Sequence, residues 1–481
     1  MRQKENGWSI FDDTKNAKKE ELHNNGVFRR QTGVEKQTQV VKTIFDMRLN
    51  IITNKCSLRQ LSSAQARLAS AMAKGDLLTK NVDKYSKYSP SPLSVQQFLD
   101  FGATSDNEQK SFEYLRYELP TRLANMIKEM NRLPKELLTT PSFENVKQMY
   151  EETLGEVLIF EKSDANDEQV REDFLNSLHG IVNRHRSVVE QVAYSVMEYK
   201  ASVQNTGNRS IDEEKMQYFL DRFYMSRIAI RVLINQHVGM FGSHVQDRSQ
   251  HALIGAFDAK CDIRKVVEDA AHAAQHLCEK YYLGAPEVEI ELVNDRNYIE
   301  MGYVPSHLHH ICFELFKNSM RAMVEEHGTF DIPPVKVLLT KGRDNVCIKI
   351  SDLGGGACLE ECRRWTHYMY STAPPPPKSE DGQNIAPLAG YGYGIPLSRL
   401  YARYLGGDLM LQSVEGYGTD AYIYLKSGNA DAVEVLPIFT NQLSDHYRNK
   451  QQMKDWVSKQ GPISTSQLNM SMQSHTTKRR Y

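Results

Sequence analysis

The sequence predicts an α+β protein in which a helical bundle comes first and a domain of helices and strands follows. Two observations lead to this fold class. Between residues 81 and 250, apolar residues recur at the spacing of a helix face. After residue 251 the period changes, and short alternating strand patterns flank one long amphipathic helix. A chain of 481 residues is long enough for two or three domains with real cores.

Composition excludes several classes of function. The chain has 59 basic and 60 acidic residues, a balance that gives no sign of a nucleic-acid or membrane partner. We find no uninterrupted apolar run long enough to span a bilayer. Cys358 and Cys362 form the closest pair among seven cysteines, and no second pair or histidine partner stands at zinc-finger spacing. We therefore expect reduced thiols in an intracellular compartment.

Residues 1–80 are expected to form an extension that precedes the folded part. Residues 1–46 are polar and mixed in charge, which is typical of disorder. Residues 47–75 contain arginines and lysines, no acidic residue, and leucines that can line one side of a helix. This is the composition of a mitochondrial transit peptide, and Met47 could serve as an alternative start. A basic surface helix within the extension is the alternative interpretation.

The region from 81 to about 250 is expected to be helical throughout. Its longer helices are expected at 142–160, 167–203 and 212–240, and with the earlier pieces they can form a four-helix bundle. Pro120 should break or kink the helix that contains it. Residues 100–102 spell the DFG of ordinary protein kinases, but no His-Arg-Asp loop or upstream glycine loop accompanies them. We interpret them as a helix end with a glycine stop.

Arginines are placed on two of these helices so that they should face each other. Asn183, Arg184 and His185 lie on one helix, and Arg227 and Arg231 lie on the next. Arginines in a cleft or core need anionic partners. The functional interpretation is a pocket for a small carboxylate effector. The simpler interpretation, which the sequence alone favours, is ion pairing with Asp or Glu inside the bundle.

The helix that carries the chemistry is predicted over residues 306–326. Ser306 follows Pro305 and is a plausible N-cap. The apolar side of the helix is expected to consist of Leu308, Ile311, Leu315, Met320 and Met323.

The polar side of this helix is a regular row. His310, Glu314 and Asn318 recur every fourth residue, and Arg321 follows three positions later. These spacings place the four side chains on one face, with Lys317 beside them. A solvated face with ordinary charges is the alternative interpretation. Two glycine clusters in the next hundred residues favour a site.

Strands and glycine loops follow the helix in a fixed order. The pattern predicts strands at 287–292, 335–339, 346–350, 408–415 and 420–425, and a helix at 395–404. One glycine cluster follows Asp352 at a strand end, and a second, 390–394, opens the helix. Between the clusters lie about thirty irregular residues, which include prolines 374–377. A loop of this length is expected to be a lid or disordered.

These residue types suit a nucleotide. Glycines let backbone N–H groups approach phosphate oxygens, and the helix after residue 394 adds its positive dipole end. Asp352 can accept a hydrogen bond from an adenine amino group, and Asn318 can hold a magnesium ion. Lys317 and Arg321 can neutralise phosphate charge. Neither the Walker A pattern nor the Rossmann pattern fits these loops.

Two residues of the polar row could perform acid–base chemistry. Glu314 can accept a proton from an attacking hydroxyl or water, and His310, one turn earlier, can orient or tune it. Each glycine cluster alone is weak evidence. The ordered set of acid–Asn helix, Asp–Gly loop, lid and Gly-x-Gly-x-Gly helix is a much stronger indication of a nucleotide site.

Several segments resemble a known family. FELFKNSMRA, DLGGG, GYGYGIPLSRLYARYLGGDL and GYGTDAYIYL resemble the ATP-binding boxes of the mitochondrial pyruvate dehydrogenase kinases, whose family also includes the branched-chain keto-acid dehydrogenase kinase and belongs to the GHKL ATPases. YSKYSPSPLSVQQFLDFG and MSRIAIRVLINQH resemble the family's helical half. The resemblance covers roughly residues 81–456.

The resemblance implies a four-helix bundle, a Bergerat-type α/β sandwich that binds ATP, and phosphorylation of a serine on the decarboxylase alpha subunit of the pyruvate dehydrogenase complex. This would inactivate the complex and control acetyl-CoA production from pyruvate. ATP and Mg²⁺ would be the cofactors, with K⁺ as an optional further ion. Glu314 would be the general base with His310 as its partner, Asn318 would bind Mg²⁺, and Asp352 would bind adenine. Nucleotide contacts would extend over Glu314, Leu315, Phe316, Lys317, Asn318, Ser319, Met320, Arg321, Gly354, Gly356, Ser371, Thr372, Gly390, Tyr391, Gly392, Tyr393, Gly394, Ile395 and Thr419.

The resemblance also implies an organisation and partners. Residues 81–250 would form the regulatory bundle that docks a lipoyl domain, 251–430 the kinase domain and 431–481 a tail. In that tail, Asp455-Trp456 would cross over to the partner subunit of a homodimer. The protein would be located in the mitochondrial matrix. The carboxylate effector pocket would include His185, Arg227 and Arg231.

The chain departs from the family pattern in two places. Val182 stands where the family's effector pocket usually has an arginine, which puts pyruvate-like feedback inhibition in doubt. The lid is slightly longer and richer in proline and charge. Three alternatives stay open: a histidine kinase that modifies His185 or His179, a kinase of the branched-chain keto-acid dehydrogenase, and a non-catalytic ATP-dependent clamp.

Overall fold

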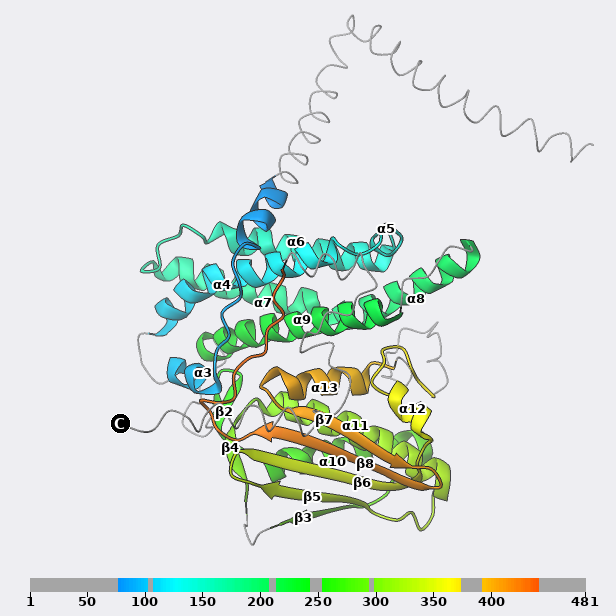
Figure 1. Cartoon of the computed structure of the whole chain (residues 1–481). Coiled ribbons are helices and arrows are strands. Elements are labelled where there is room, and N and C mark those ends of the chain that lie inside the picture. Colours follow the sequence, from blue (N-terminus) through cyan, green and yellow to red (C-terminus); the bar gives the residue numbers. More distant parts are fainter. Residues whose placement is uncertain are drawn as a thin grey trace, which may run out of the picture. The chain divides into compact units, whose positions relative to one another are not determined.

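The computed structural model describes residues 77–102, 107–206, 213–242, 253–293, 298–372 and 392–440. The chain divides into two units, and Leu78–Tyr481 is the one that contains both the helical layer and the sheets. Figure 1 shows the helical layer packed against one side of the sheet layer. The predicted transit segment 47–75 and the predicted Asp455-Trp456 tail lie outside the described residues.

The helical layer packs long helices around an apolar core. Its elements are α3 (Val95–Gly102), α4 (Asn107–Met130), α5 (Lys135–Leu138), α6 (Pro141–Ile159), α7 (Glu168–Arg184), the 3₁₀ turn η2 (His185–Ser187), α8 (Val188–Thr206) and α9 (Glu213–Phe241). Phe112 of α4 and Phe174 of α7 are fully buried and meet edge to face, with ring centroids 4.9 Å apart. The DFG tripeptide is the last described part of α3.

Two predictions for this layer are corrected in detail. Of the break or kink expected at Pro120, the break does not occur, because helix α4 is continuous through this proline. Leu119 and Leu123 on either side of this proline are buried in the core, and their packing offsets the lost backbone hydrogen bond. The helix predicted at 167–203 is two helices separated by η2, where the buried His185 ring bonds to the Thr153 hydroxyl of α6 at 2.9 Å.

The second layer is a mixed five-stranded sheet in the order β3-β5-β6-β8-β7. Its strands are β3 (Val288–Leu292), β5 (Val335–Lys341), β6 (Asn345–Gly355), β8 (Tyr417–Lys426) and β7 (Asp408–Val414). Only β3 and β5 pair in parallel among the described strands of this sheet. The predicted strands are confirmed, because each coincides with one of these within a few residues.

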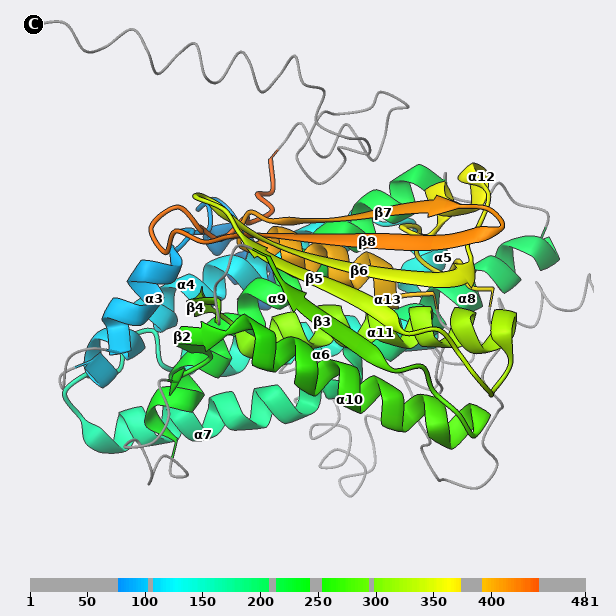
Figure 2. The same ribbon diagram turned by 90° about the horizontal axis from the view of Figure 1, so that it is seen from below.

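Helices cover one face of this sheet. They are α10 (Ile263–Tyr282), α11 (Pro305–His327) and α13 (Gly394–Tyr404), and the short α12 (Leu359–Arg364) lies beside β7. Figure 2 shows the strands side by side with α10 and α11 on the same side. Helix α13 packs on β7 and also on α9, so it lies between the sheet and the helical layer. A small sheet, β1 (Leu253–Ile254), β2 (Phe257–Asp262) and β4 (Glu300–Tyr303), adjoins α3.

A buried ionic cluster joins the two layers. Arg122 of α4 donates to both carboxylate oxygens of Glu434 at 2.8 Å and to Glu118 at 2.7 Å. The Tyr404 hydroxyl, at the end of α13, also donates to Glu434. Because α13 begins at the edge of the cavity described next, this cluster fixes the far end of a helix that shapes the site.

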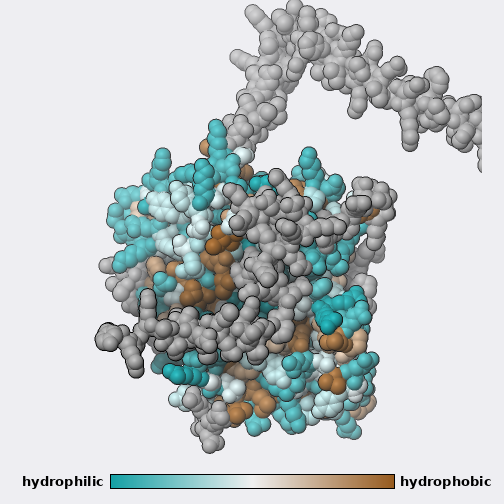
Figure 3. All heavy atoms as spheres, in the orientation of Figure 1, coloured by the Kyte–Doolittle hydropathy of each residue, from teal (hydrophilic) through white to brown (hydrophobic). Residues whose placement is uncertain are grey.

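Hydrophilic residues cover most of the described surface on the face shown in Figure 3, and apolar residues form separate groups. Among the described residues, none of the helices combines the length and the apolar character that a membrane crossing requires.

Candidate nucleotide-binding site

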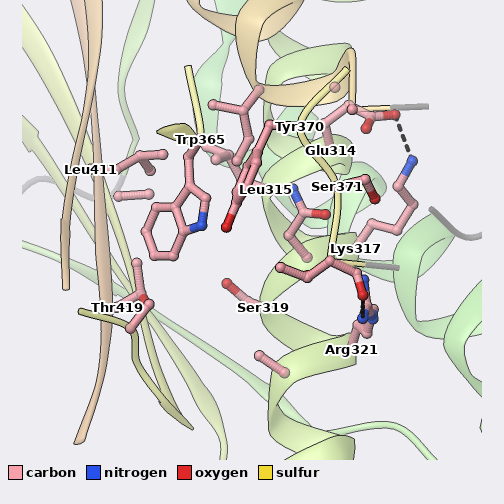
Figure 4. Close-up of a pocket in the computed structure, with 18 of the residues that line it drawn as sticks. Glu314, Leu315, Lys317, Ser319, Arg321, Trp365, Tyr370, Ser371, Leu411 and Thr419 are labelled. Carbon is pink, nitrogen blue, oxygen red and sulfur yellow. Dashed lines mark hydrogen bonds and ion pairs between the residues drawn. The ribbon is translucent and has the colours of Figure 1, made fainter. Parts of the chain in front are cut away.

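A cavity of about 600 Å³ lies between α11 and the strands β6, β7 and β8. The segment 365–372 and the start of α13 close its remaining sides. Figure 4 shows side chains from α11, from β7 and β8 and from the segment 365–372 around the cavity. This volume falls in the range of small-molecule sites, and the walls mix apolar groups with a few polar ones.

Helix α11 supplies the polar wall, as the spacing predicts. His310, Glu314, Leu315, Lys317, Asn318, Ser319 and Arg321 all line the cavity. Two residues assigned to the nucleotide by resemblance, Phe316 and Met320, are wholly buried in the core and do not line it. They lie on the opposite side of the helix, because successive residues turn by about 100°. Ser306 is not the N-cap: α11 starts at Pro305, a residue suited to the first helical turn.

Glu314 stands between a cation and a helix N-terminus. Lys317 Nζ donates to its Oε1 at 2.8 Å, and Figure 4 shows this pair at the edge of the cavity. A Cβ atom added to Gly394, the first residue of α13, would collide with Oε2 of the same carboxylate. A side chain at position 394 would therefore displace the Glu314 carboxylate from the N-terminus of α13. The carboxylate reaches the cavity with a fixed orientation.

His310 lies one turn before Glu314 and is largely buried. Its ring packs against Tyr401 of α13, with centroids 4.9 Å apart. Its Nε2 has no hydrogen-bond partner among the described residues. Burial lowers the pKa of His310, although the Glu314 carboxylate opposes this shift. At neutral pH the imidazole is therefore uncharged behind the carboxylate.

Asp352 forms the opposite end of the cavity, in β6. Ser319 Oγ donates to its Oδ2 at 2.8 Å, and the backbone N–H groups of Gly354 and Thr419 donate to its Oδ1 at 3.1 and 3.2 Å. Burial raises the pKa of Asp352, and these three donors oppose the shift. Each carboxylate oxygen has two lone pairs, so acceptor capacity remains for a ligand amino group.

Glycines let the backbone close around Asp352. A Cβ at Gly354 would lie 2.6 Å from the Cβ of Ala322, so β6 passes α11 too closely for a side chain. Gly356 has φ of +62°, in the left-handed region that favours glycine. The glycines after Asp352 therefore serve close approach and turn geometry at the cavity wall.

The structure adds residues that sequence reasoning missed. Trp365, Tyr370 and Leu411 line the cavity, and Figure 4 shows the Trp365 and Tyr370 rings reaching into it beside Leu411 and Thr419. For Trp365 and Tyr370, the sequence offered one weak signal, namely that aromatic residues are frequent after the first glycine cluster. Their spacing does not indicate which of them face a ligand.

The other predicted contacts are distributed unevenly. Gly354, Gly356, Ser371, Thr372, Gly392, Tyr393, Gly394, Ile395 and Thr419 line the cavity, whereas Gly390 and Tyr391 lie outside the described residues.

The two arginine-bearing helices of the bundle face each other as predicted. Two of the arginines bond to backbone carbonyl groups and not to acids. Arg227 donates to the carbonyl of His185 at 3.1 Å, and Arg231 donates to that of Val182 at 3.0 Å. Only Arg184 of this group pairs with an acid among the described residues. For Arg227 and Arg231 the preferred ion-pair interpretation was therefore wrong. Arg227 Nε is buried without a described partner, and burial lowers the pKa of His185 to about 4.

Comparison with known proteins gives consistent results. A family model described as mitochondrial branched-chain alpha-ketoacid dehydrogenase kinase matches residues 92–258. A second, described as histidine kinase-, DNA gyrase B-, and HSP90-like ATPase, matches residues 303–429, which contain most of the cavity. The domain that this second model describes binds ATP.

Relatives of similar length match most of the chain. The mitochondrial pyruvate dehydrogenase (acetyl-transferring) kinase isozyme 4 of Rattus norvegicus is 45% identical over 395 residues, 81% of this chain and 94% of its own. Isozyme 3 of Mus musculus is 48% identical over 383 residues, 78% and 91% of the two chains. Isozyme 1 of Homo sapiens is 45% identical over 380 residues, 78% and 86% of the two chains. The chain therefore belongs to the mitochondrial pyruvate dehydrogenase kinase family of protein kinases, with a GHKL-type ATPase domain.

Proposed function

We propose that the protein is an ATP-dependent serine kinase that phosphorylates the decarboxylase alpha subunit of the pyruvate dehydrogenase complex and inactivates it. It would thereby control acetyl-CoA production from pyruvate. One observation carries the proposal: the Glu314–Lys317 pair lies at the start of α13, and Asp352 lies at the other end of the same cavity. The chain that holds this cavity is 45–48% identical to pyruvate dehydrogenase kinases.

In this proposal the nucleotide lies along α11. Asp352, held by three donors, accepts a hydrogen bond from the adenine amino group. The phosphates lie near the start of α13, where free backbone N–H groups and the helix dipole favour anions. Lys317 and Arg321 line the same side and balance the phosphate charge.

Asn318 fits the role of a magnesium ligand. Its amide lines the cavity between the two ends, and the described residues contain no cluster of three or more acids, histidines or cysteines that could hold a metal alone. Mg²⁺ commonly takes one or two protein oxygens and completes its shell with phosphates and water. Bound there, the ion supplies positive charge to the phosphate oxygens. We assign no described residue to K⁺.

Glu314 is the proposed general base. A serine oxygen bonds to the γ-phosphorus while the bond to the β–γ bridging oxygen breaks, so that ADP leaves. The hydroxyl proton passes to the Glu314 carboxylate. His310, one helical turn earlier, is uncharged and packs against Tyr401, and in this proposal it helps to orient the Glu314 carboxylate.

The remaining predictions stand as proposals. Residues 81–250 would dock a lipoyl domain and sense a small carboxylate through His185, Arg227 and Arg231, while 251–430 would carry catalysis. The protein would act in the mitochondrial matrix as a homodimer, with Asp455-Trp456 in the cross-over tail. The relatives' names, which say mitochondrial, support the mitochondrial location.

One experiment separates the candidate substrates. The purified chain is incubated with ATP labelled at the γ-phosphate and with either the pyruvate or the branched-chain dehydrogenase complex. We expect acid-stable label on the decarboxylase alpha subunit of the pyruvate complex. Label on the branched-chain complex alone would favour the second candidate, which the family model matching residues 92–258 supports by its description. Acid-labile label on the kinase itself would indicate a histidine kinase.

A further inference from the structure

The residue Tyr368 joins the rim of the cavity to the helical layer. Its hydroxyl donates to Oδ1 of Asp221 at 2.8 Å, and its backbone N–H donates to Oε1 of Gln217 at 3.0 Å. Asp221 and Gln217 lie one turn apart on α9. None of the three lines the cavity, although Tyr370, only two residues after Tyr368, does.

The Tyr368 ring is equally well fixed. Only 3% of the residue is exposed, and its ring centroid lies 5.6 Å from that of Tyr224 on α9 and 5.2 Å from that of Tyr393. Tyr393 immediately precedes α13 and lines the cavity. One buried aromatic group thus contacts the helical layer on one side and the start of the phosphate-facing helix on the other.

The backbone just after Tyr368 is strained. Met369 has φ of +64°, a left-handed conformation that is costly for a residue with a side chain. Its N–H donates to the carbonyl of Gly392 at 3.2 Å. A Cβ at Gly392 would collide with the Tyr370 carbonyl, so the two backbone segments are in direct contact. Such strain persists only where the surrounding contacts determine the conformation.

From this geometry we propose that Tyr368 and its acceptor Asp221 are positioning residues for the nucleotide. They hold the segment 368–372 against α9, so that Tyr370, Ser371 and Thr372 stand at the cavity rim and Gly392 stays in contact with them. The inference rests on the proposed ATP site and deepens it: nucleotide affinity depends on a carboxylate of the helical layer that touches no nucleotide.

The test compares three variants of the full-length chain. Tyr368→Phe removes only the hydroxyl, Asp221→Ala removes its acceptor, and Asp221→Asn keeps an acceptor oxygen. We expect the KM for ATP and the calorimetric Kd of ADP to rise about tenfold in the first two variants, the size of one lost hydrogen bond. Asp221→Asn should stay within about twofold of the wild type, and kcat at saturating ATP should change by less than about threefold in every variant.

Tyr404→Phe is the matched control. It also removes a hydroxyl that donates to a buried carboxylate, that of Glu434, but at the end of α13 away from the cavity. It should lower the thermal midpoint about as much as Tyr368→Phe and leave the Kd of ADP unchanged. The Tyr368→Phe/Asp221→Ala double variant should bind ADP no more weakly than either single variant, because both remove the same bond.

The outcomes separate the two proposals. A wild-type chain that binds no ADP and transfers no phosphate overturns the proposed function. A wild-type chain that binds ADP, together with a Tyr368→Phe variant of equal affinity, overturns the positioning role and leaves the kinase function intact. Equal loss of affinity in Tyr368→Phe and Tyr404→Phe also overturns it, because general destabilisation then explains the effect.

Discussion

Glu314 concentrates the proposed chemistry in one carboxylate, and its surroundings suggest a sharp test. Glu314→Gln keeps the shape of the side chain and its contact with Lys317 but cannot accept the substrate proton. We expect kcat to fall by roughly 10²–10⁴-fold, the usual contribution of a general base, while the calorimetric Kd of ADP stays within a few-fold. Glu289→Gln, on an exposed position of β3, is the control. Wild-type turnover in Glu314→Gln would remove Glu314 from the mechanism.

Trp365 gives a second prediction at the scale of one side chain. Its indole reaches into the cavity beside Leu411 and Thr419, and the Thr419 N–H donates to Asp352, the residue that would hold the base. Stacking of a base on an aromatic ring contributes about 1–3 kcal/mol per base where proteins bind single-stranded nucleic acids. Trp365→Leu should therefore weaken ADP binding by roughly tenfold or more.

The same residue provides a direct optical signal. The chain has three tryptophans, and Trp8 and Trp456 lie outside the described residues. In a Trp8→Phe/Trp456→Phe variant, adding ADP should change the fluorescence of Trp365. The Kd fitted to this fluorescence change should equal the Kd measured by calorimetry. If saturating ADP leaves the Trp365 fluorescence spectrum unchanged, the adenine base does not stack on Trp365.

At the residue scale the sequence predicted what periodicity can encode. The row His310, Glu314 and Asn318 follows from helix geometry, and all three line the cavity. Phe316 was assigned by resemblance to a contiguous motif, and the helix turns it into the core. Trp365 reaches the cavity from an irregular segment, where no period relates position in the sequence to direction in space.

Helix α9 carries a half-buried acid, Asp221, whose titration can be measured. Burial raises the pKa of Asp221 from 3.8 to about 6, although Tyr368, Arg403 and Arg399 oppose the shift. The folded state therefore keeps the Asp221 proton up to a higher pH than the unfolded chain does. This proton binding contributes to the free energy of unfolding below about pH 4, and the contribution is lost as pH rises from about 4 to 6. The upper limit of this loss is about 3 kcal/mol.

Asp221→Asn removes this dependence. Its free energy of unfolding, measured with denaturant between pH 5 and 7.5, should fall less with rising pH than that of the wild type. Desolvation lowers the pKa of His307 to about 3, and this group has the opposite effect, since its contribution to stability rises with pH. Only the difference between the two proteins therefore reports on Asp221. Parallel profiles would contradict the raised pKa.

At the scale of elements, strong patterns were predictable and weak ones were not. The strands of the large sheet and α11 were found because their apolar residues are large and periodic. Helix α10 was missed because its buried face consists largely of small residues, such as Ala270, Ala271 and Ala274. The break at η2 depends on a bond from His185 to another helix, which local sequence does not encode.

At the scale of the whole molecule, the layers are joined by contacts between distant parts of the chain. Arg122 and Glu434 are 312 positions apart, and the side chains are 3% and 0% exposed. No spacing rule links such positions, and Glu434 lies in a segment that sequence analysis treated as a tail. The relative placement of helical layer and sheet could therefore not be predicted from the sequence without the resemblance.

The buried Arg122 cluster should be a main determinant of stability for this unit. Arg122→Met leaves the carboxylates of Glu118 and Glu434 buried without their cation, and loss of one partner of a buried pair typically destabilises by about 3–5 kcal/mol. Differential scanning calorimetry should show a clearly lower unfolding midpoint. Adding Glu434→Gln removes one stranded charge while retaining an acceptor for the Tyr404 hydroxyl, so the double variant should be more stable than Arg122→Met alone. A double variant that is less stable than both single variants would mean that Glu434 holds the layers together through contacts other than this charge pair.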